Sequence, residues 1–358
     1  MVINTGILSS LCIPHLIQRL PTMATSSVAE IGLSSTSVLA SLAENTKIVG
    51  SMWILSSALF TTYSTTTFLK YQDERGILSS GSKSVLAPSM ARPALLTLYR
   101  FAGSLFLGLV AHPNLHVLQR FQETTAACRP FAIPATFLFV ANYANSISLD
   151  RIGISLTYTS KCGIPLITVL LTLLMDGTKA LPNAGALLSL IPIAIGIAAA
   201  SWNSPNFEAW GFMAAMISCA AQSALNVSSK RAMMKTGLTG AHAQRAMVAV
   251  GFVIVMAMSF IQKASSSSSD VEVTKSLPPP NWLSAMAILA YHVEYVLSFM
   301  FVKLVAPITY GACDAIRRLA IIITGQWMFG GKPFSSLNYV GMGLALLGAL
   351  GYSISSSL

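Results

Sequence analysis

The sequence predicts an all-α polytopic membrane protein with ten transmembrane helices in two inverted five-helix repeats. Three observations support this prediction. The chain of 358 residues is 54% hydrophobic and only 9% charged, whereas a typical soluble domain is about 25% charged. Apolar runs of about 20 residues recur along the chain, and this is the length that a bilayer-spanning helix needs. Two of these runs also carry similar polar residues, which indicates an internal repeat.

Ten apolar runs account for most of the chain. The predicted spans are residues 47–69, 92–112, 131–147, 151–175, 181–202, 208–228, 242–262, 282–303, 306–329 and 336–356. A polar stretch, Ser-Leu-Asp-Arg at 148–151, separates the third span from the fourth. Most other connections are short, as expected for helices that are neighbours in a membrane bundle.

We expect a transporter domain at residues 46–356, made of repeats at about 46–202 and 208–356. Residues 1–45 are rich in Ser and Thr and form a predicted tail, either disordered or a targeting segment. The Ser- and Pro-rich segment 263–281 is predicted to be a flexible loop.

The net charge of +10 could indicate a nucleic-acid-binding protein. Such a protein gathers its basic residues on one wet face, but here they are spread thinly between apolar runs. We therefore expect a lipid bilayer and no nucleic acid among the partners. The densest basic group, at Lys230, Arg231 and Lys235, favours cytosolic termini because basic loops stay in the cytosol.

The repeat is indicated by two segments in the fourth and ninth spans. A Thr-Tyr pair at 157–158 precedes Lys161, and a Thr-Tyr pair at 309–310 precedes Arg317 and Arg318. Each pair is followed by an apolar run and then by a Gly-rich span. Two five-span repeats would have opposite topologies because five is odd, and transporters of this design bind substrate at the repeat interface.

Six ionisable residues fall inside the predicted spans, where each would cost about 2.5–3.5 kcal/mol at the bilayer centre. They are Arg100, Lys161, Glu294, Asp314, Arg317 and Arg318. Four cations and two acids leave an excess of two positive charges. This excess predicts a polar cavity for an anionic ligand, and paired arginines suit a phosphate. The alternative is that all six form structural ion pairs between helices.

Helical spacing places further polar residues beside these charges. Asp314 lies three and four residues before the two arginines, so we expect it to pair with one of them. Pro165 frees the carbonyl of Lys161 from helix bonding. Whether Arg100 faces the cavity or a helix or subunit contact stays open. The candidate substrate-binding residues are Asn142, Asn145, Thr157, Tyr158, Lys161, Tyr291, Glu294, Tyr310, Asp314, Arg317 and Arg318.

The cysteines show no metal-ligand spacing, so we expect no metal and no cofactor. No nucleophile, base and orienting group share one span, which argues against an enzyme. The sequence does not determine the oligomeric state, and a homodimer is one of the states that stay open.

Several motifs resemble those of a known family. They are Ala-Pro-Ile-Thr-Tyr at 306–310, Arg-Arg-Leu at 317–319, Leu-Ala-Leu-Leu-Gly at 344–348, Leu-Ile-Pro-Ile-Ala-Ile-Gly at 190–196 and Asn-Val-Ser-Ser-Lys-Arg at 226–231. In order and spacing they are similar to the triose-phosphate and nucleotide-sugar translocators of the drug/metabolite transporter superfamily. The resemblance covers roughly residues 47–356.

The resemblance implies ten helices in two inverted repeats and strict exchange of anions. Lys161 falls where phosphate-type members have a phosphate-binding lysine, and Arg317 and Arg318 fall on the family's Lys-Arg pair. Asn145 falls on a substrate-contacting threonine. Glu294 departs from the family pattern, since it stands where a tyrosine is expected.

The leading hypothesis is a secondary antiporter that moves its substrate by alternating access. It would exchange a phosphorylated sugar or nucleotide sugar for phosphate or a nucleoside monophosphate. A non-transporting membrane scaffold or receptor with the same fold is the alternative. We expect a Golgi or other endomembrane location, with the plastid inner envelope as the second choice.

Overall fold

The computed structural model describes residues 45–71, 87–110, 117–177, 182–202, 204, 207–266, 280–305, 307–330 and 335–355. Its helices belong to one unit. The predicted tail 1–45 lies outside these residues apart from Asn45, and so does most of the predicted loop 263–281.

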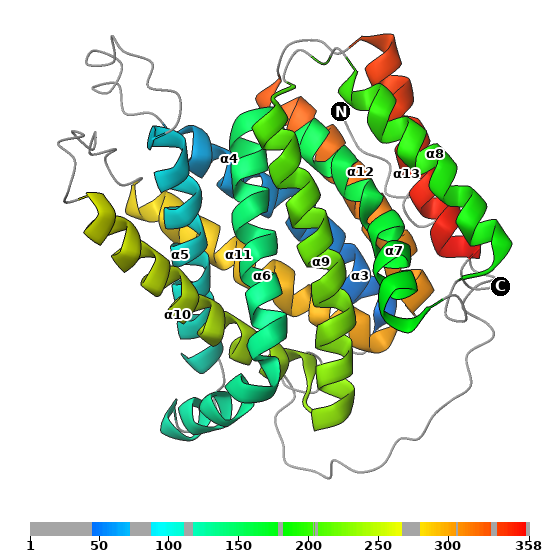
Figure 1. The fold of residues 1–358 in the computed structure, drawn as a ribbon. Coiled ribbons are helices and arrows are strands. Elements are labelled where there is room, and N and C mark those ends of the chain that lie inside the picture. Colours follow the sequence, from blue (N-terminus) through cyan, green and yellow to red (C-terminus); the bar gives the residue numbers. More distant parts are fainter. Residues whose placement is uncertain are drawn as a thin grey trace, which may run out of the picture. The chain divides into compact units, whose positions relative to one another are not determined.

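The described residues form helices and short connections, with no strand among them (Figure 1). The elements are α3 (Thr46–Leu55), the π-turn η2 (Ser56–Thr61), α4 (Thr62–Lys70), α5 (Ala87–Val110), α6 (Val117–Ser160), the 3₁₀ turn η3 (Lys161–Gly163), α7 (Ile164–Asp176), α8 (Ala184–Ser201), α9 (Ala209–Thr236), α10 (Gly240–Ser266), α11 (Asn281–Leu304), α12 (Pro307–Phe329) and α13 (Ser336–Ser355).

Six helical segments of the described chain are long and apolar enough to cross a membrane. Helix α12 is not among them, and it carries Asp314, Arg317 and Arg318 within its length. Helical residues also occupy each of the ten predicted ranges. The number of ten crossings and the inverted relation between the two halves stay predictions.

The third and fourth predicted spans meet at a sharp turn inside α6. Ser148 and Thr157 are nine residues apart, which corresponds to about 13 Å along a straight helix, yet their hydroxyl oxygens lie 2.7 Å apart. The chain therefore folds back between them, at Gly153, whose φ of 75° favours glycine. The break was expected at 148–151, so the structure places it just after that stretch.

Several helices extend beyond their predicted ends. Helix α6 begins at Val117, before the predicted start at residue 131, and contains Pro130 and Pro134. Helix α9 continues to Thr236 and stops at Gly237, which has a left-handed conformation. Helix α10 continues to Ser266, so residues 263–266 are helical and not part of a loop as expected. Polar residues can continue a helix past the apolar run on which the span predictions rest.

Helices α8 and α13 lie side by side (Figure 1). Their backbones touch because glycines face each other across the contact. A Cβ on Gly196 would lie 2.4 Å from the Ala345 nitrogen, and a Cβ on Gly341 would lie 2.4 Å from the Ala200 nitrogen. Small residues at such contacts are typical of packed membrane helices.

Candidate anion-binding cavity

A cavity lies among α3, α5, α6, α9, α11 and α12 and encloses about 820 Å³ of space, including its open mouth. Ten of the eleven candidate residues line it. They are Asn142, Asn145, Tyr158, Lys161, Tyr291, Glu294, Tyr310, Asp314, Arg317 and Arg318. Thr157 is not part of the lining, because its hydroxyl is bonded to Ser148 at the α6 turn.

Arg317 is held by two acids from different helices. Its Nη1 lies 2.7 Å from an oxygen of Glu294 on α11, and its Nη2 lies 2.7 Å from Asp314 one turn earlier on α12. The guanidinium also lies over the Trp53 ring, 4.9 Å from its centroid. Trp53 in turn stacks on Tyr310 with 5.0 Å between ring centroids. Aromatic faces and acids therefore fix the position of this cation.

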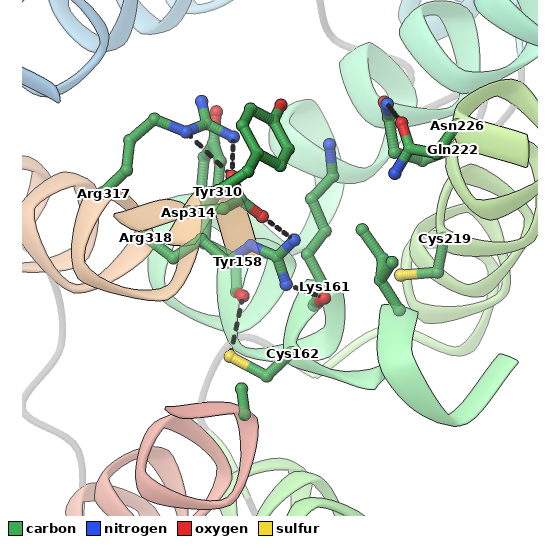
Figure 2. Close-up of polar contacts among 12 residues, drawn as sticks. Tyr158, Lys161, Cys162, Cys219, Gln222, Asn226, Tyr310, Asp314, Arg317 and Arg318 are labelled. Atoms are coloured by element: carbon green, nitrogen blue, oxygen red, sulfur yellow. Dashed lines mark hydrogen bonds and ion pairs between the residues drawn. The ribbon is translucent and has the colours of Figure 1, made fainter. Parts of the chain in front are cut away.

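Arg318 joins α12 to the turn that carries Lys161. It donates one hydrogen bond to the second oxygen of Asp314 and another to the main-chain carbonyl of Lys161 (Figure 2). That carbonyl belongs to η3, and Pro165 follows four residues later near the start of α7. Since proline has no N–H, the carbonyl lacks its α-helical partner and accepts the Ile164 N–H together with Arg318.

Asp314 therefore contacts both arginines, one through each carboxylate oxygen. The predicted pair with one arginine is present, and Asp314 pairs with the other arginine as well. A carboxylate has two oxygens, and the 3- and 4-residue spacings bring both guanidiniums within reach. Its single charge still offsets only one of the two cations, and Glu294 supplies the second negative charge.

The ammonium of Lys161 has no carboxylate within 4 Å among the described residues. Its Nζ lies 5.5 Å from the centroid of the Tyr158 ring. Figure 2 shows this side chain extending between the Arg–Asp group of α12 and an amide pair on α9, formed by Gln222 and Asn226. The Gln222 amide donates to the Asn226 oxygen at 3.1 Å.

Arg100 also lines the cavity, which decides the question that the sequence left open. The residue is 3% exposed. It donates a hydrogen bond to the Thr65 hydroxyl, and its guanidinium lies 5.3 Å from the centroid of the Tyr291 ring. No carboxylate of the described chain lies within 4 Å of it.

The rest of the lining is uncharged, and part of it is polar. The Asn142 amide lies 3.1 Å from the Tyr295 hydroxyl, so an amide of α6 faces a phenol of α11. Gln222, Asn226 and Tyr295 were not among the candidates, although Gln222 and Asn226 are four residues apart and share a helix face. Two amides on one face of an otherwise apolar span were the signal that could have identified them.

The sequence profile of the Triose-phosphate Transporter family matches residues 81–353. This chain belongs to that family. It is an integral, multi-pass membrane protein of the triose-phosphate and nucleotide-sugar translocator group within the drug/metabolite transporter superfamily.

Among its relatives is phosphoenolpyruvate/phosphate translocator 2, chloroplastic, of Arabidopsis thaliana, 27% identical over 73% of this chain and 69% of that protein. Phosphoenolpyruvate/phosphate translocator 1, chloroplastic, of the same plant is 29% identical over 76% of this chain and 66% of its own length. The non-green plastid triose phosphate/phosphate translocator of Brassica oleracea var. botrytis is also 29% identical, over 76% and 67%. These plastid names give no support to the Golgi expectation or to a nucleotide sugar as substrate.

Proposed function

We propose that this protein is an antiporter that exchanges a phosphorylated metabolite for inorganic phosphate across a plastid membrane. The main support is one feature of the cavity. Its four cations, Arg100, Lys161, Arg317 and Arg318, face only two acids among the described lining residues. A phosphate dianion would offset the remaining positive charge. The relatives support the same reading, since they are named as translocators of organic phosphates against phosphate.

In this proposal the phosphate binds beside Lys161. The ammonium supplies an unpaired positive charge there, and the guanidiniums of Arg317 and Arg318 are held next to it by Asp314. The amides of α6 and α9 face the same cavity and offer donors and acceptors to the sugar or carbon skeleton.

The same charge balance gives a physical reason for strict exchange. An empty cavity would have to change its access with uncompensated cations inside the membrane, where each charge is expensive. A bound anion removes that penalty. Each half-cycle of alternating access, in which the two repeats rock against each other, therefore requires an anion on the side where the cavity opens.

The test uses purified protein in vesicles loaded with phosphate. We expect uptake of labelled organic phosphate only in exchange for internal phosphate. Arg317→Ala and Arg318→Ala should abolish it without unfolding the protein. Arg92→Ala is a control, because Arg92 bonds the Leu69 carbonyl away from the cavity. Normal exchange by both cavity variants would contradict the proposal.

A membrane scaffold on the same fold is the second candidate, and one observation favours it. Both arginines of α12 are already paired with acids, as structural ion pairs would be. Thermal unfolding with and without sugar phosphates separates the two cases. A carrier is stabilised by its ligand, whereas a scaffold should unfold at the same temperature with every compound.

A further inference from the structure

We propose that Arg100 forms a second anion subsite in the cavity, so that preferred substrates carry a carboxylate in addition to their phosphate. This inference rests on the proposed function, because it assumes that the cavity binds a phosphorylated metabolite. It goes further by assigning a specificity role to a residue on α5.

The two acids of the cavity do not neutralise its four cations evenly. Glu294 and Asp314 are both engaged with Arg317, and Asp314 also holds Arg318. The excess of two positive charges is therefore not shared evenly among the four cations. It belongs to Lys161 and Arg100, which lack a carboxylate within 4 Å in the described part of the chain.

Arg100 is buried and its contacts are uncharged. At 3% exposure its charge is largely removed from water, and its Nε is buried without a hydrogen-bond partner. The Thr65 hydroxyl and the Tyr291 ring are its neutral contacts. A buried cation left with neutral contacts is costly, and an unsatisfied buried donor indicates a missing acceptor. Because Arg100 lines the cavity, a ligand can supply that acceptor.

Lys161 and Arg100 lie on different elements of the cavity wall. Lys161 lies in η3 with its main-chain carbonyl on Arg318 of α12, whereas Arg100 contacts α4 and α11. The two cations without acids thus belong to different walls of one cavity, with Arg317 and its two acids also in the lining. A ligand that satisfies both needs an anionic group at each end, and one negative charge on each group would offset the excess of two. The planar fork of a guanidinium matches the two oxygens of a carboxylate.

Two probes that differ in one group test this inference. 3-Phosphoglycerate carries a phosphate and a carboxylate, and glycerol 3-phosphate has a hydroxymethyl group in place of the carboxylate. Dissociation constants are measured on the purified protein in detergent, and competition with phosphate exchange is measured in vesicles. For the wild type we expect 3-phosphoglycerate to bind about tenfold more tightly than glycerol 3-phosphate.

Arg100→Gln should reduce this ratio to about one, and Arg100→Lys should keep part of it, because lysine retains the charge without the fork. Arg92→Gln, on the same helix but outside the cavity lining, should keep the wild-type ratio. If Arg100→Gln does not fold, the ratio of the lysine variant decides.

Equal binding of the two probes by the wild type would overturn the inference. So would a loss of affinity in Arg100→Gln that is the same for both probes, since that is the result expected of a purely structural arginine. The binding measurement stands without transport. Absent phosphate exchange would therefore contradict the proposed function but leave the subsite to be judged by the binding ratio.

Discussion

The guanidinium of Arg318 donates a hydrogen bond to the main-chain carbonyl of Lys161. The two residues are 157 positions apart and belong to the two halves that the sequence predicts to be repeats. Each is also a cation that lines the cavity. The contact therefore fixes the distance between the charged turn of the first half and the charged helix of the second.

Pro165→Ala tests this contact. Alanine would restore an N–H that can bond the Lys161 carbonyl in the α-helical pattern, in competition with Arg318. We expect slower exchange and weaker phosphate binding, with the unfolding temperature little changed, because Pro165 lies in the first turn of α7, where a helix tolerates proline.

The matched control is Pro192→Ala. Pro192 lies inside α8 and outside the cavity lining. It should leave phosphate binding as in the wild type. Equal effects of the two substitutions on binding would show that the carbonyl of Lys161 is not special.

The two acids should differ in their contributions to stability. Asp314→Asn removes the group that both arginines share, and breaking a buried ion pair costs about 3–5 kcal/mol. Glu294→Gln should cost less, because Arg317 retains Asp314. The free energy of unfolding in detergent measures both. A larger loss in Glu294→Gln would contradict the observed pairing.

Glu294→Gln should also change ligand binding. Without Glu294 the guanidinium of Arg317 has one fewer anionic partner, so it becomes more available to phosphate. We expect the KM for phosphate to fall about fivefold, which corresponds to about 1 kcal/mol. An unchanged or higher KM would indicate that Arg317 does not contact the transported anion.

The contact between α8 and α13 can be tested with two glycines of one helix. Gly341→Ala places a Cβ 2.4 Å from the Ala200 nitrogen, so the helices must separate, at about 1–3 kcal/mol. Gly343→Ala meets nothing within 4 Å and should be neutral or stabilising. Unfolding temperatures of the two variants provide the comparison, and equal values would argue against close backbone contact.

Much of the helical arrangement could be predicted from the sequence, because long apolar runs and their interruptions determine where membrane helices lie. Exact ends could not be predicted in this way. The turn at Gly153 depends on one residue with a positive φ between two helical stretches, and a single glycine has no hydropathy signal. The start of α6 at Val117 was missed because that stretch is too polar to resemble a span.

The charged part of the cavity was predictable because an ionisable residue inside an apolar span is conspicuous. The uncharged part was not. Gln222 and Asn226 carry no charge, and only their shared helix face relates them to the cavity. The pairing of Asp314 with both arginines depends on side-chain directions that residue spacing leaves open.

In the proposed exchange, the cavity changes its access only with an anion bound. This requirement is tested most directly by the efflux of labelled phosphate from vesicles that contain the purified protein. We expect efflux when phosphate or an organic phosphate is present outside, and almost none into an anion-free medium. Efflux at the same rate into both media would contradict it.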